Sequence, residues 1–96
     1  MRIVLPETIS LLGKELSVSR KPLVDCYAEY KHDSNEILVD TKCPEHLVWG
    51  VLLHEITHAI LTITGVAELL DEKLEEAICV SMENLGPIVQ LVKVKK

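Results

Sequence analysis

The chain has few aromatic side chains and few features of a basic surface. It contains one Trp, two Tyr and no Phe in 96 residues, so its core has to be built from Leu, Ile and Val. The formal net charge of −5 argues against a nucleic-acid-binding surface, because such surfaces are rich in Lys and Arg. The one basic run, KVKK at the C-terminal end, is expected to be a solubilising tail.

Targeting signals and a disulfide pattern are also missing. The run MRIVLPETIS is broken by Pro6 and Glu7, unlike a signal peptide, and we expect no apolar run long enough to span a membrane. The cysteines Cys26, Cys43 and Cys79 are an odd number without a pairing pattern, which favours a reduced, cytoplasmic protein. We interpret Cys26 and Cys79 as small buried hydrophobic residues.

The order of short β-prone runs and longer helical runs predicts one α+β domain over residues 1–96. Residues 1–42 are expected to form a small, mainly antiparallel sheet built from two hairpins, with turns near Gly13 and within KHDSN. The last strand of this sheet is EILVD, residues 36–40, where Ile37 and Val39 point to one face. We therefore expect this strand to be covered on one face only.

Two helices are predicted after the sheet. The first spans residues 43–65, because Pro44 suits a first helical turn and Gly65 is a natural stop. The second spans residues 67–86, begins near Ala67 or Glu68 and is ended by glycine and proline. The remaining tail, residues 87–96, fits a strand, a short helix or an extended segment equally well.

The stretch LLHEITHAI within the first helix contains the motif H-E-x-x-H, formed by His54, Glu55 and His58. Positions four apart lie on one face of a helix, so both imidazoles can reach one Zn²⁺ ion. Glu55 follows the first histidine and can act as general base towards a water on the metal. Placing these polar groups in an apolar helix without a partner would be costly, and zinc supplies that partner.

A third protein ligand is needed, since catalytic zinc sites have three protein ligands and one position for water. The second helix offers four acids in DEKLEE, namely Asp71, Glu72, Glu75 and Glu76. Helical phase alone favours Glu75, which lies at the edge of the apolar stripe of Leu74, Ile78 and Leu85. His32 and His46 are expected to be exposed and outside the site.

These motifs resemble the gluzincins, the thermolysin-like zinc peptidases, in which a glutamate on the following helix completes the HExxH site. EEAICVSMENL is similar to the gluzincin ligand helix, and this register implies Glu76 as the third ligand. The order of EILVD, LLHEITHAIL and an acidic helix also resembles small metallopeptidase domains of phages and mobile elements, including the ImmA/IrrE type. The resemblance covers residues 35–85.

Two features depart from that family. Gluzincins have an acid four residues after the ligand glutamate, which supports a ligating histidine, but Val80 stands there in this chain. Support must then come from elsewhere, and Asp40 is one candidate. Cys43 lies near a helix N-terminus, which lowers a thiol pKa, and it is either a residue of the capping region or an inhibitory zinc ligand.

The sequence thus predicts a zinc-dependent peptidase with His54, His58 and Glu76 as metal ligands and Glu55 as base. Its substrate is a peptide or protein, and the resemblance implies that EILVD receives it by strand addition. Two alternatives stay open, because the chain is short and lacks a separate substrate-binding subdomain. One is a latent or partner-specific metallopeptidase-like regulator, and the other is a binding module with purely structural zinc.

Overall fold

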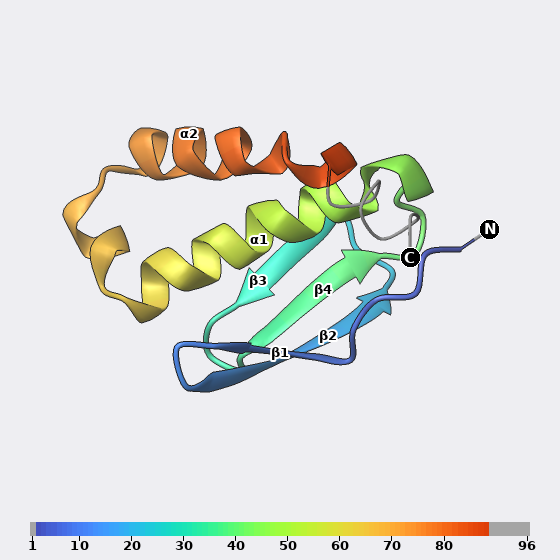
Figure 1. Ribbon diagram of the computed structural model, residues 1–96, viewed down its shortest axis with the longest axis horizontal. Helices are drawn as coiled ribbons and strands as arrows, with labels where there is room; N and C mark the ends of the chain where they lie inside the picture. Colours follow the sequence, from blue (N-terminus) through green and yellow to red (C-terminus); the bar gives the residue numbers. More distant parts are fainter. Residues whose placement is uncertain (1, 89–96) are drawn as a thin grey trace.

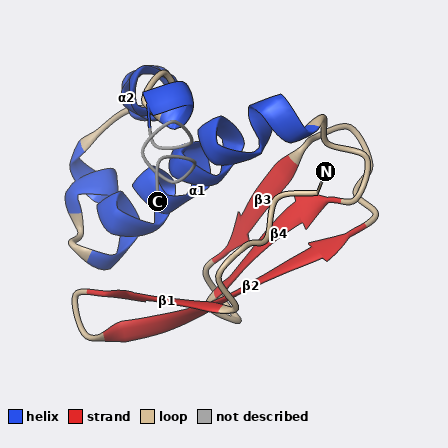
Figure 2. Ribbon diagram, turned by 45° about the vertical axis from the view of Figure 1, so that its right-hand side comes forward, coloured by secondary structure: helices blue, strands red, loops and turns tan. Residues whose placement is uncertain are grey.

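Two helices are stacked on one face of a four-stranded sheet (Figure 1). The computed structural model describes residues 2–88. The strands are β1 (Thr8–Leu11), β2 (Lys14–Lys21), β3 (Ala28–Lys31) and β4 (Glu36–Asp40), and the helices are α1 (Val48–Ile63) and α2 (Glu72–Glu83). α1 crosses the sheet, and α2 lies on the side of α1 that faces away from it (Figure 2). The α+β prediction is confirmed.

The sheet is mixed, with strand order β1-β2-β4-β3. Both predicted hairpins form, since β1 pairs with β2 and β3 pairs with β4 in antiparallel fashion. The pairing of β2 with β4, however, is parallel, which the expectation of a mainly antiparallel sheet did not include. The parallel pairing arises from the order of the strands. After β2 the chain forms β3 at the far edge of the sheet, and β4 then runs antiparallel to β3 and lies between β3 and β2.

The strand β4 is the centre of the sheet rather than a strand covered on one face. Ile37 and Val39 are fully buried in the core under α1, and Leu38 and Asp40 on the opposite face are also buried. A strand with hydrogen-bonded neighbours on both sides cannot accept a further strand. The expectation that EILVD receives a substrate is therefore wrong; of the described strands, β1 and β3 form the sheet edges.

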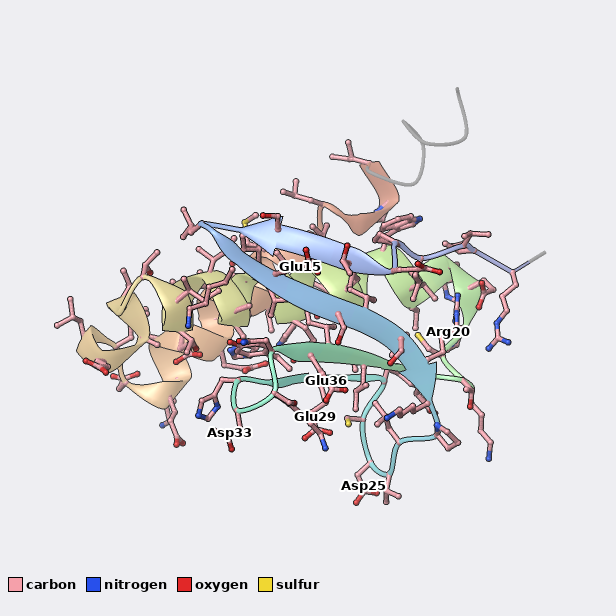
Figure 3. All side chains as sticks on the ribbon, turned by 90° about the horizontal axis from the view of Figure 1, so that it is seen from below. Glu15, Arg20, Asp25, Glu29, Asp33 and Glu36 are labelled. Atoms are coloured by element: carbon pink, nitrogen blue, oxygen red, sulfur yellow. The ribbon has the colours of Figure 1, made fainter. Side chains whose placement is uncertain are left out.

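The outer face of the sheet carries acidic side chains, among them the labelled Glu15, Glu29 and Glu36 (Figure 3). They alternate along the strands with residues whose side chains face the helices, as the two-residue period of a strand requires. Val18 on β2 and Tyr30 on β3 are on the inner side, where they pack with Trp49 and Leu52 of α1.

The helix boundaries differ from the predicted ones at both starts, and α2 ends at Glu83 instead of residue 86. Residues Glu45–Leu47 form a short 3-10 turn, η1, and the α-helix begins at Val48. The predicted stop at Gly65 is confirmed, because this residue has a left-handed φ of 82°. After a second 3-10 turn, η2 (Val66–Leu69), helix α2 begins only at Glu72, because the side chain of Asp71 caps it by accepting the Leu74 N–H at 2.7 Å. Residues 89–96 of the predicted tail lie outside the described residues.

The segment Glu45–Ile63 is long and apolar enough to cross a membrane by length and composition alone, with a mean hydropathy of 1.3. This differs from the expectation that no run is long enough. The same test is met by core helices of globular domains, and here the segment packs between the sheet and α2. It also carries the two histidines and Glu55, which would be costly in lipid.

Close to the end of α2, Gly86 of the following segment meets Gly50 of α1. A Cβ atom on Gly86 would lie 2.6 Å from the Cα atom of Gly50 and closer still to its backbone nitrogen. A Cβ atom on Gly50 would lie 3.1 Å from the carbonyl oxygen of Glu83. Only glycine fits at position 86, and this contact restrains how the end of α2 lies over α1.

We expect Gly86→Ala to lower the free energy of unfolding by about 1–3 kcal/mol, because the added methyl group meets backbone that cannot rotate away. Urea unfolding followed by circular dichroism measures this change. Val80→Ala is the matched control, since it removes methyl groups from an exposed position of α2. Equal stability of Gly86→Ala and the wild type would contradict the close helix crossing.

Candidate metal centre

The three motif residues lie on the part of α1 that faces α2 and the start of β3. The imidazole rings of His54 and His58 lie with their centroids 5.1 Å apart and their planes inclined by 51°. Both side chains are mostly buried, with exposed fractions of 14% and 22%. The spacing of four residues therefore brings the two rings together, as the motif predicts.

The carboxylate of Glu76 lies between the Nε2 atoms of these rings. Its Oε1 atom is 2.7 Å from Nε2 of His54, and its Oε2 atom is 3.2 Å from Nε2 of His58. The glutamate indicated by the family register is thus the one that meets both imidazoles at the same nitrogen. Glu75, the alternative favoured by helical phase, lies on the other side of the His58 ring, with Oε2 2.7 Å from Nδ1.

A carboxylate also contacts Nδ1 of the other histidine. Oε1 of Glu83 lies 2.7 Å from Nδ1 of His54. Glu83 was missed in the sequence, although it lies seven residues, and so two turns, after Glu76 on the same helix face. Each Nδ1 atom thus faces a carboxylate of α2, Glu83 for His54 and Glu75 for His58.

These contacts fix the tautomers of both rings. An ionised carboxylate only accepts hydrogen bonds, so each Nδ1 atom donates to its glutamate. In a neutral imidazole the remaining Nε2 atom is then an acceptor, and here it faces the Glu76 carboxylate, which is another acceptor. One cation bound to all three groups, or protons shared among them, would satisfy these facing acceptors.

Asp40 does not support the histidines. Its Oδ1 atom accepts the backbone N–H of Leu23 at 3.1 Å, so the side chain anchors the loop that follows β2. The suggestion that Asp40 orients a metal ligand is therefore wrong. Its position at the end of a strand was a poor indicator, because β4 presents this residue to the face of the sheet away from α1.

Glu55 lies beside the two histidines but is held by the sheet. Its Oε2 atom is 4.0 Å from Nε2 of His54, and its carboxylate accepts the backbone N–H of Tyr30 on β3. Burial raises the pKa of Glu55 above its ordinary value, and the neighbouring His54 and His58 act in the opposite direction. The residue is thus close to the histidines without taking part in the contacts that join them to α2.

A cysteine also lies in this centre. Among residues 2–88, one ring nitrogen from each of His54 and His58 and the Sγ atom of Cys79 lie within 4.8 Å of one another, so this group can hold a metal ion. Burial raises the pKa of the Cys79 thiol to about 12, and the charges of Glu76 and Glu75 add to the effect. The interpretation of Cys79 as a buried residue is confirmed, but its place beside the histidines was missed.

The other two cysteines lie elsewhere. Cys26 is exposed, so its interpretation as a buried residue is wrong. Cys43 is buried in the core with Val39 and Val48. Burial raises the pKa of its thiol, contrary to the lowering expected near a helix N-terminus. The core environment of Cys43 favours a packing role over the alternative of an inhibitory zinc ligand.

Two open pockets flank the histidines. One, of about 490 Å³, is lined on the His58 side by His58, Glu72, Lys73, Glu75 and Glu76. The other, of about 260 Å³, is formed by Tyr27 and Ala28 at the start of β3, by Val51, His54 and Glu55 of α1, and by Glu83 of α2. The second pocket connects the edge of the sheet with the motif carboxylate. His32 is remote from both and contacts Asp33 at 3.1 Å.

No protein-family model matches this chain, and no curated protein matches it at a significant level. The resemblance to gluzincin-type metallopeptidases therefore stays a prediction.

We expect Glu83→Gln and Glu75→Gln each to lower the affinity for Zn²⁺ by about 10–100-fold, because an amide orients the imidazole less strongly than a carboxylate. Competition with a chromophoric zinc chelator measures this affinity. Glu68→Gln is the matched control, since Glu68 is exposed in η2. Equal affinity in all four proteins would contradict the supporting role of Glu83 and Glu75.

Proposed function

We propose that this protein is a zinc-dependent peptidase of gluzincin type, related to the ImmA/IrrE-like enzymes, with His54, His58 and Glu76 as metal ligands. One observation carries the proposal: both Nε2 atoms face one carboxylate while both Nδ1 atoms are held by other carboxylates. Two imidazoles and one carboxylate are the donor set of catalytic zinc sites. One divalent cation satisfies the three acceptor groups at once.

The fit of zinc is supported by the chemistry of the donors. Nitrogen and oxygen ligands in a small, partly buried site suit Zn²⁺ better than Mg²⁺ or Ca²⁺, which prefer oxygen ligands alone. Zinc bound there would supply Lewis-acid chemistry, polarising a peptide carbonyl and activating a water molecule. Charge balance also favours a divalent cation, because the side chains of Glu55, Glu75, Glu76 and Glu83 gather around only two imidazoles.

Glu55 is proposed as the general base and acid. Its carboxylate is near His54 Nε2, at 4.0 Å, yet it is bound to the sheet through the Tyr30 N–H and not to the Glu76 bridge. It can therefore take a proton from the attacking water at one oxygen and deliver it to the leaving amine. The histidines meanwhile keep their orientation through Glu83 and Glu75.

The substrate is proposed to be a peptide bound in extended form along β3. The strand β3 is an edge of the sheet. Just before it, the carbonyl of Tyr27 points towards β4 and accepts the Asp40 N–H at 2.7 Å. Because backbone directions alternate in an antiparallel pair, Ala28 presents its N–H and carbonyl to the free edge, and Tyr30 presents its carbonyl there while its N–H is bonded to Glu55. The pocket between Tyr27, Ala28 and Glu55 lies along this edge.

The proposal includes a reducing compartment such as the cytoplasm, which suits three free thiols. It includes no nucleic-acid or membrane partner. The two alternatives remain a latent or partner-specific regulator and a module in which zinc is only structural. Both alternatives have the same metal ligands as the proposed peptidase. They differ from it because Glu55 does not act as a general base on peptide substrates in general.

Metal content tests the ligand set. We expect about one zinc per chain in protein purified without a histidine tag, and loss of most of it in His58→Ala and Glu76→Ala. Elemental analysis of dialysed protein measures it, and Glu68→Ala serves as control. The absence of zinc in the wild type after incubation with the metal would sink the peptidase proposal. Full retention of zinc in Glu76→Ala would remove this residue from the ligand set.

Replacement of the base tests catalysis. Glu55→Gln is expected to lower the rate of hydrolysis by about 10²–10⁴-fold while the bound zinc and the fold stay unchanged, because Glu55 is not a ligand. A library of fluorescence-quenched peptides is the probe, with circular dichroism and zinc content measured on the same samples. A wild type that binds zinc but cleaves none of the peptides favours the regulatory or structural alternatives. Equal rates in both proteins would rule out Glu55 as base.

A further inference from the structure

We propose that Cys79 is a fourth protein ligand of the resting metal centre, so that its thiolate closes the site until it is displaced. This inference rests on the proposed centre of His54, His58 and Glu76 and concerns its regulation. It assigns a role to a buried nucleophile that the proposed peptidase mechanism leaves unused.

The position of Cys79 carries the inference. Cys79 lies three residues after Glu76 on α2, so both side chains project from the same face of the helix. Its Sγ atom and one nitrogen of each histidine lie within 4.8 Å of one another. Around a tetrahedral zinc with bonds of about 2.0–2.3 Å, ligand atoms are roughly 3–4 Å apart. The sulfur and the two ring nitrogens are thus within about an ångström of that spacing.

The surroundings distinguish Cys79 from a cysteine that only fills space. Cys79 is the one buried residue among the twelve of α2, all of which the structure describes. The larger apolar side chains Leu74, Val80 and Leu85 on this part of the chain are 40% or more exposed. The helix thus buries a sulfur beside imidazoles and carboxylates, whereas Leu74 and Val80 are exposed and Ile78 is only partly buried.

A fourth protein ligand changes what the centre does. Zinc sites with four protein ligands are closed and structural, whereas catalytic sites keep one position for water. Metal binding forms the sulfur–metal bond and releases the thiol proton to solvent. Opening breaks that bond: the sulfur takes up a proton from solvent, and a water molecule takes its place. The closed form is latent, and the open form has the three-ligand set of the proposed peptidase.

The thiolate also sets the choice of metal. A soft sulfur ligand favours Zn²⁺, Co²⁺ and Cd²⁺ over Mg²⁺, Ca²⁺ and Mn²⁺. Cobalt is therefore a suitable probe, because a thiolate ligand gives a charge-transfer band in the near ultraviolet that imidazole and carboxylate ligands do not give. The cobalt bands in the visible range report binding irrespective of sulfur.

The test compares cobalt-loaded wild type with Cys79→Ser, and uses Cys43→Ser as a buried control and Cys26→Ser as an exposed control. We expect the charge-transfer band in the wild type and in both controls. We expect its complete loss in Cys79→Ser, with the visible cobalt bands retained. Zinc-loaded Cys79→Ser is expected to hydrolyse quenched peptides several-fold faster than the wild type, because the fourth position is open from the start.

Bound cobalt without a charge-transfer band in the wild type would overturn the inference and leave the proposed centre of His54, His58 and Glu76 intact. The absence of any cobalt binding would overturn that centre as well. Equal or slower hydrolysis by Cys79→Ser would overturn the latency. If Cys79→Ser does not fold, cadmium NMR of the wild type decides, because the cadmium chemical shift reports directly whether sulfur is bound.

Discussion

The close contact of α1 with the segment that follows α2, at Gly50 and Gly86, is the constraint on which the whole centre depends. Since a methyl group at Gly86 would meet the backbone of Gly50, the chain leaving α2 lies nearer to α1 than an ordinary side chain permits. Glu83, one turn before Gly86, then reaches His54, and Glu76, two turns earlier again, spans both Nε2 atoms. A wider crossing would leave these glutamates short of the imidazoles.

This contact joins two helices through charged groups instead of aliphatic ones. Three glutamates of α2 meet the two histidines of α1, while Leu74, Val80 and Leu85 are left substantially exposed. Glu75 is mostly buried, Glu76 and Glu83 are about half exposed, and the interface has more carboxylates than imidazoles. A divalent cation would supply the missing positive charge at the point where the acceptors converge. Packing of α2 on α1 and binding of a cation are therefore expected to stabilise each other.

The same feature explains which parts of the site could be predicted. The pair His54 and His58 followed from spacing alone, because four residues along a helix always return to one face. The orientation of α2 did not, since hydrophobic periodicity assumes that the aliphatic stripe is buried, and here Cys79 is the buried residue of α2 while Leu74 and Val80 are exposed. Had the phase been anchored on Glu76, positions three and seven residues further on would have indicated Cys79 and Glu83.

The sheet shows a different limit of local patterns. Turn residues fixed both hairpins, but no local signal says that β4 enters between β2 and β3, because that choice depends on long-range pairing. The position of β4 in the sheet makes β3 the edge strand beside the candidate metal centre, and the N–H of Tyr30 on β3 bonds to Glu55. The strand proposed to bind the substrate thus also positions the proposed base. A peptide laid along β3 would therefore have its scissile bond placed relative to Glu55 by the backbone of one strand, with no separate substrate-binding subdomain needed.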